Sequence, residues 1–160
     1  MFNIYGKQNV LNIVKKIELS NENIEWLGSA HFPGDFSGWD KKIKLYYSVA
    51  EEYKIDKIVW TIVHEYGHML DFFVTKNWNI SAEEQMIDVF ALPLGITKSE
   101  YKRILAYGIV RSTYGRTSNK ELFAEAFAQW ILTPEKYRDL AWEKLDNFFR
   151  DNLPKNKVFL

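Results

Sequence analysis

The residues HEYGH at positions 64–68 constrain the fold of this chain more than any other feature of its sequence. They lie in its longest apolar, helix-forming stretch, residues 56–75, for which we predict a central and largely buried helix. Residues four apart lie on the same face of a helix, so the imidazoles of His64 and His68 can bind one metal ion. Glu65 follows the first imidazole, where its carboxylate can act on a water that the metal polarises. The motif therefore predicts a catalytic zinc site and favours a metallopeptidase.

The segments around this helix are predicted from the spacing of apolar residues and from capping and turn signals. Strands are expected at residues 24–28 and 42–47, with a glycine-containing loop at 31–40 between them. The remaining expected elements are helices at 7–18, 81–93, 97–110, 119–132 and 133–154, with a turn at 114–117. The predicted fold class is α+β, mostly helical, with a small N-terminal sheet, and residues 1–160 are expected to form one domain.

Composition narrows the classes of partner. Hydrophobic residues make up 47% of the 160 residues, and 21 basic side chains balance 21 acidic ones. This balance argues against nucleic acid as the main partner, because phosphate binding needs a basic excess. Cysteine is absent, which excludes thiolate ligands, a cysteine nucleophile and disulfides. With neither a signal-peptide pattern nor an apolar run of about 20 residues, we expect a soluble monomer without a membrane partner and leave its compartment open.

The motif supplies two metal ligands, whereas a catalytic zinc takes three protein ligands and keeps one position for water. Asp71 lies on the same helix as both imidazoles, and one straight helix cannot easily wrap three ligands around an ion. It therefore suits a role in orienting an imidazole. His31 falls in the expected loop at 31–40, where a packing or surface role is expected.

Glu121 and Glu125 are the other candidates for the third ligand. They lie one turn apart on a predicted helix that is otherwise rich in apolar residues, and buried carboxylates require a cation or hydrogen-bond donors. Glu121 also completes a capping-box pattern with Ser118, which gives it a second explanation. The chemistry of the side chains alone leaves the choice between the two glutamates open.

Two segments of the chain resemble a known family. Residues 64–71 read HEYGHMLD and residues 112–127 read STYGRTSNKELFAEAF. Together they resemble the catalytic domain of anthrax lethal factor and its Pro-Pro endopeptidase relatives, which belong to the gluzincins. The resemblance implies a zincin-like fold and one zinc ion per chain.

The same resemblance implies a role for each matched side chain. The implied zinc ligands are His64, His68 and Glu121. Glu65 corresponds to the general base and Tyr114 to the hydroxyl that stabilises the oxyanion or assists the leaving group. Glu125 corresponds to a carboxylate that lies behind an imidazole ligand.

The predicted function is a zinc-dependent endopeptidase, a hydrolase that cleaves peptide or protein substrates with metal-activated water. One alternative is a toxin-like or binding module that contains zinc without peptidase activity. Another is an interaction protein with histidines in its core. Structural zinc sites are usually closed by a fourth protein ligand, and none is apparent in the sequence. The identity of the substrate is left open.

Overall fold

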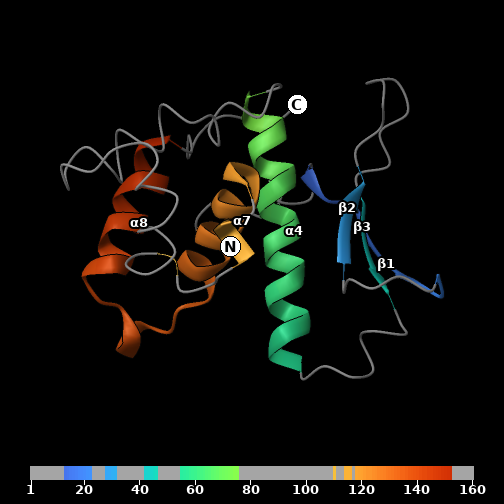
Figure 1. The fold of residues 1–160 in the computed structure, drawn as a ribbon, viewed down its shortest axis with the longest axis horizontal. Helices are drawn as coiled ribbons and strands as arrows, with labels where there is room; N and C mark the ends of the chain where they lie inside the picture. The colour runs from blue at the N-terminus through green and yellow to red at the C-terminus, as the bar shows by residue number, and fades with distance from the viewer. Residues whose placement is uncertain are drawn as a thin grey trace.

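The computed structural model describes residues 13–22, 28–31, 42–46, 55–75, 110, 114–116 and 118–152. These residues are mostly helical, with one small sheet, as the α+β prediction requires (Figure 1). The strands are β1 Lys16–Ser20, β2 Gly28–His31 and β3 Lys42–Tyr46. The helical elements are α4 Ile55–Thr75, the 3₁₀ turn η2 Tyr114–Arg116, α7 Asn119–Leu132, the 3₁₀ turn η3 Glu135–Tyr137 and α8 Leu140–Asn152.

Helix α4 is the central element of the fold. Figure 1 shows the sheet on one side of it, α7 on the other, and α8 beyond α7. Every residue from 63 to 71 is buried, as is typical of a helix that is packed on several sides. Within the described residues, no helix combines the length and apolar character that crossing a membrane requires.

The sheet packs against α4 through its edge strand β2. The strand order is β1-β3-β2, with β1 parallel and β2 antiparallel to β3. Gly28 opens β2, and a Cβ atom at this position would lie 2.6 Å from the Cγ2 atom of Thr61 on α4. The absence of a side chain at Gly28 therefore allows the strand to approach the helix closely.

The prediction of a helix at 7–18 is wrong in its C-terminal part. Ile13 is helical, but from Lys16 onward the chain forms β1 and pairs with β3, with Ile17 opposite Ile43. Apolar and charged residues alternate between Lys16 and Leu19, which is a strand period, and the pairing with β3 outweighs the helical spacing of the preceding apolar residues.

Two other boundaries differ from the predictions. The described part of the strand expected at 24–28 begins at Gly28 and runs to His31, so His31 belongs to β2 and not to a loop. The last helix starts at Leu140, not at residue 133, because η3 intervenes and the Asp139 carboxylate accepts a hydrogen bond from the backbone N–H of Trp142 at 3.0 Å. An aspartate that accepts such a bond begins a new helix.

Other elements match the predictions. The helices at 56–75 and 119–132 are confirmed as α4 and α7, and the strand at 42–47 as β3. The turn predicted at 114–117 is η2. The helix expected at 81–93, and the one at 97–110 except for its last residue, lie outside the described residues.

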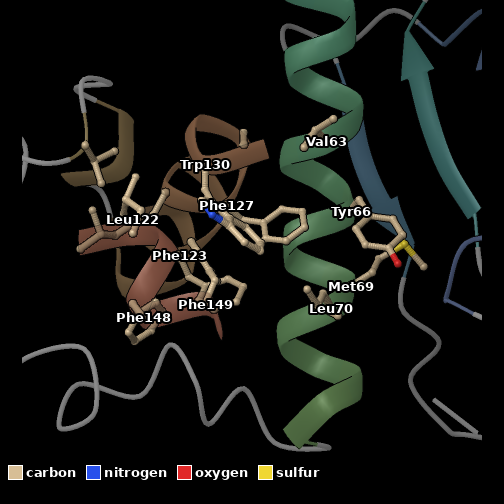
Figure 2. Close-up of a cluster of buried hydrophobic side chains, with 14 of the residues drawn as sticks. Val63, Tyr66, Met69, Leu70, Leu122, Phe123, Phe127, Trp130, Phe148 and Phe149 are labelled. Carbon is tan, nitrogen blue, oxygen red and sulfur yellow. The ribbon is translucent and has the colours of Figure 1, made fainter. Parts of the chain in front are cut away.

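The core lies between α4, α7 and α8. Figure 2 shows the aromatic side chains of α7 and α8 gathered there, with Phe127 extending toward α4. Phe149 contacts Phe123, Phe127 and Phe148 with ring centroids 5.1–5.5 Å apart and stacks on Trp130 at 4.9 Å. Rigid aromatic packing of this kind fixes α8 against α7, and the stacking of Tyr66 on Phe127 at 6.0 Å joins α7 to α4.

At Gly67, helix α4 packs closely against α7. A Cβ atom at Gly67 would lie 3.1 Å from the Cα of Ala124 and 3.3 Å from the Cβ of Phe127. A glycine within a buried helix costs about 1 kcal/mol relative to alanine, and the close helix contact accounts for its presence here. The close packing at Gly67 therefore contributes to the short distances between the histidines of α4 and Glu121 of α7.

Replacing Gly67 by alanine is expected to lower the free energy of unfolding. Overpacking costs about 1–3 kcal/mol, which opposes the gain of about 1 kcal/mol in helix propensity. The contact at Ala124 involves backbone and cannot relax by a side-chain rotation, so the overpacking cost prevails. Urea denaturation measures the difference, and an unchanged or raised free energy of unfolding would show that the helices do not touch at this glycine.

Candidate metal centre

Helices α4 and α7 bring three candidate ligand atoms together. His64 and His68 lie one turn apart on α4, and Glu121 lies in the first turn of α7. The two Nε2 atoms are 3.1 Å apart, and Glu121 Oε2 lies 3.0 Å from His64 Nε2 and 3.2 Å from His68 Nε2. The three atoms thus form a nearly equilateral triangle.

This triangle has the size and chemistry of a metal site. Ligand atoms around a tetrahedral zinc with bonds of about 2.0–2.1 Å are separated by about 3.3 Å, close to the distances between these atoms. Two imidazole nitrogens and one carboxylate oxygen are a donor set that zinc accepts. His64, His68 and Glu121 could therefore hold a metal ion.

The start of α7 explains how Glu121 reaches this position. Ser118 caps the helix, and its hydroxyl accepts a hydrogen bond from the backbone N–H of Glu121 at 3.2 Å. The capping pattern predicted from the sequence is therefore present on the Ser118 side. The cap fixes the backbone of Glu121. The Glu121 carboxylate is not used in the cap and contacts the two imidazoles.

Glu125 approaches His64 from the opposite side of the imidazole ring. Its Oε1 atom lies 2.7 Å from His64 Nδ1, although the ring N–H is not aimed straight at that oxygen. The same Oε1 accepts a hydrogen bond from the indole N–H of Trp60 at 3.2 Å. Because an ionised carboxylate only accepts hydrogen bonds, this arrangement favours a proton on Nδ1 and leaves Nε2 free to bind a metal.

The electrostatics of the cluster favour positive charge. Burial disfavours the charged form of His64, but its contacts with Glu121 and Glu125 outweigh burial and raise its pKa to about 9. Burial likewise opposes ionisation of Glu121, but hydrogen bonds from His64 and His68 lower its pKa to about 2. The two pKa shifts have the same cause, because a positive charge at the imidazoles and the negative charge of Glu121 stabilise each other. A divalent cation at this position would be stabilised by the same ionised carboxylate.

Glu65 and Tyr114 lie beside this cluster. Glu65 is buried, and its charge acts on both His64 and Tyr114. The Tyr114 ring centroid lies 5.9 Å from that of His64, and the side chain remains 55% exposed. Burial of part of the ring, followed by the charges of the nearby glutamates, raises the pKa of Tyr114. Its hydroxyl therefore stays protonated near neutral pH and can donate a hydrogen bond.

Gly115 holds the Tyr114 turn against α7. A Cβ atom at Gly115 would lie 3.3 Å from the Cα of Leu122 and 3.5 Å from the Cβ of Glu125. The glycine allows η2 to lie directly on the helix that carries Glu121 and Glu125. The residue pattern Tyr-Gly ahead of a capped helix therefore has a packing reason in this fold.

Of the two weaker candidates from the sequence, Asp71 lies outside the triangle, and the structure describes His31 by its backbone alone. Asp71 is fully buried on α4, three residues after His68, and its predicted role in orienting an imidazole stays a prediction. His31 is the last residue of β2, with its backbone paired to Lys42. Among the described residues, the cluster that can hold a metal consists of the two motif histidines and Glu121.

Trp60 contacts Glu125 beside the cluster and was not identified from the sequence. It lies one turn before His64 on α4, in an apolar stretch where a tryptophan is expected to pack in the core. The available signal was its spacing of four residues from His64, which places both side chains on one face of the helix. Only the position of Glu125 on α7 reveals what its indole N–H contacts.

Tyr66, inside the motif, is part of the hydrophobic core. Its side chain is 3% exposed, its ring stacks on Phe127, and its hydroxyl has no hydrogen-bond partner among the described residues. An unmet buried hydroxyl costs about 1–3 kcal/mol. Tyr66→Phe is therefore expected to raise the free energy of unfolding by about 1 kcal/mol without reducing metal affinity, as measured by urea denaturation and zinc titration. A loss of stability would mean that the hydroxyl bonds to a group outside this description.

Comparison of the chain with protein-family models, with curated proteins and with solved structures found no match. The resemblance to the gluzincins therefore rests on the two sequence segments, 64–71 and 112–127.

Proposed function

We propose that this protein is a zinc-dependent endopeptidase with a zincin-like fold, related to the lethal factor group of gluzincins. The observation that carries the proposal is the convergence of His64 Nε2, His68 Nε2 and Glu121 Oε2 to within 3.2 Å of one another. The two histidines and Glu121 come from the two segments that carry the family resemblance, which are separated by forty residues.

The reaction uses a water molecule as the nucleophile. Zinc, when bound, polarises the scissile carbonyl and lowers the pKa of the attacking water toward about 7. The Glu65 carboxylate takes a proton from this water and later delivers it to the leaving amine. The protonated hydroxyl of Tyr114 donates a hydrogen bond to the oxyanion of the tetrahedral intermediate. Glu125 orients the His64 ring from behind.

Metal analysis combined with a peptide library tests the proposal. The protein, purified without chelators, is expected to contain one zinc per chain and to cleave a subset of internal peptide bonds, as detected by mass spectrometry. Chelation should stop cleavage and added zinc should restore it. Stoichiometric zinc without any cleavage would favour a binding module, and protein without metal affinity would favour an interaction protein.

Tyr114→Phe is expected to reduce turnover by about 10²–10³-fold while zinc content stays unchanged, because it removes a hydrogen bond to developing charge. Tyr137→Phe is a matched control, since Tyr137 is similarly exposed but lies in η3, outside the cluster. The measurement is kcat on a cleaved library peptide. Equal turnover by the two variants would remove Tyr114 from the mechanism.

A further inference from the structure

The Glu125 carboxylate oxygen that contacts His64 has a second partner on the same helix. Trp60 donates its indole N–H to Glu125 Oε1 at 3.2 Å, and His64 Nδ1 lies 2.7 Å from that same atom. Trp60 and His64 are four residues apart on α4 and lie on the same face of the helix. Both side chains therefore contact the same oxygen atom, Oε1 of Glu125 on α7.

The indole can restrict how the carboxylate turns. A glutamate carboxylate rotates easily about its last torsion, and rotation would carry Oε1 away from the imidazole. Trp60 is partly buried and packs against the hydrophobic core, so its N–H has a fixed direction. A partly buried donor at this point opposes rotation, because an indole N–H that is left unpaired there loses its hydrogen bond without full compensation from water.

We propose that Trp60 is a positioning residue of the metal centre: its indole N–H fixes the Glu125 carboxylate, which in turn fixes the orientation and tautomer of the His64 ligand. The inference rests on the proposed function only in taking His64 as a metal ligand. In this arrangement Trp60 on α4 positions the Glu125 carboxylate on α7, and Glu125 positions His64 on α4.

A purely structural role for Trp60 makes a different prediction. If the side chain only fills space, its replacement lowers stability without a specific effect on the metal. If its N–H orients Glu125, then loss of the donor weakens metal binding and changes the ligand geometry even where the fold is intact. Outer hydrogen-bond partners of metal ligands are commonly worth about 10–100-fold in affinity, and a partner one bond further out is expected near the lower figure.

The test compares Trp60→Phe with Trp142→Phe. Both tryptophans are partly buried against the core and donate an indole hydrogen bond, but Trp142 donates to the backbone oxygen of Trp130. Zinc affinity is measured by competition with a chromophoric chelator, and geometry by the visible spectrum of the Co²⁺-substituted protein. Trp60→Phe is expected to lower zinc affinity about tenfold and to shift the Co²⁺ bands, whereas Trp142→Phe leaves both unchanged.

A double-mutant cycle with Glu125→Ala separates the route of the effect. If Trp60 acts through Glu125, then Trp60→Phe has no further effect on zinc affinity in the Glu125→Ala background. Trp60→Leu, which lacks the same donor in a different apolar shape, should reproduce the loss and keeps the test valid should the phenylalanine variant fold poorly. Zinc affinity and Co²⁺ bands unchanged in the Trp60 variants, or losses that add fully to that of Glu125→Ala, would overturn the inference. Wild-type protein that binds no zinc would instead overturn the proposed function.

Discussion

Replacement of Glu65 by glutamine is expected to abolish peptide cleavage while one zinc ion per chain stays bound. Glutamine keeps the size of the side chain but cannot accept a proton from the attacking water near neutral pH. The side chain is not one of the three converging ligand groups, so metal binding should persist. General base catalysis commonly contributes about 10²–10⁴-fold, and the loss in kcat is expected within or above that range.

The measurement pairs kcat on a library-derived peptide with zinc content by elemental analysis. Glu143→Gln provides a matched control, because Glu143 is an exposed glutamate on α8, a helix that contributes no residue to the cluster. It should leave both cleavage and zinc unchanged. An active Glu65→Gln variant would show that another group takes the proton. Loss of zinc from this variant would instead make Glu65 a ligand.

The parts of the fold that could be predicted from the sequence are those determined by local pattern. Helix α4 follows from a long apolar stretch of helix formers, and α7 from the Ser118 cap and the apolar residues after it. The helix predicted at 7–18 is wrong at residues 16–18, because their conformation depends on pairing with β3, more than twenty residues away. Pairing of this kind is a tertiary effect that overrides local spacing.

The candidate site likewise has a part that local pattern predicts and a part that depends on tertiary packing. The face shared by His64 and His68 follows from helical spacing alone. Which of Glu121 and Glu125 meets Nε2 depends on how α7 is placed along α4, and that placement is set by the contact at Gly67 and by the core packing. No local rule encodes this placement. The contact between Trp60 and Glu125 was missed for the same reason, since it joins residues 65 positions apart.

The placement of α7 leads to the second large expected effect: Glu121→Ala should lose stoichiometric zinc, whereas Glu125→Ala should bind zinc more weakly but retain it. Glu121 Oε2 lies within 3.2 Å of both Nε2 atoms, whereas Glu125 Oε1 contacts His64 at Nδ1. Loss of an outer partner costs about 10–100-fold in affinity, and loss of one of three ligands is expected to cost more than that.

Both variants replace a carboxylate on one face of α7 by the same small side chain, so each serves as the control of the other. Zinc affinity from chelator competition gives the ranking, and dialysis at neutral pH followed by elemental analysis gives the retained stoichiometry. Alanine at position 121 leaves Ser118 and its cap on α7 unchanged in sequence, so circular dichroism should report an intact helix. Retention of zinc by Glu121→Ala together with its loss from Glu125→Ala would exchange the two roles, because it would require Glu125 to reach the Nε2 side of the imidazoles. Wild-type zinc affinity in both variants would mean that neither carboxylate binds the metal.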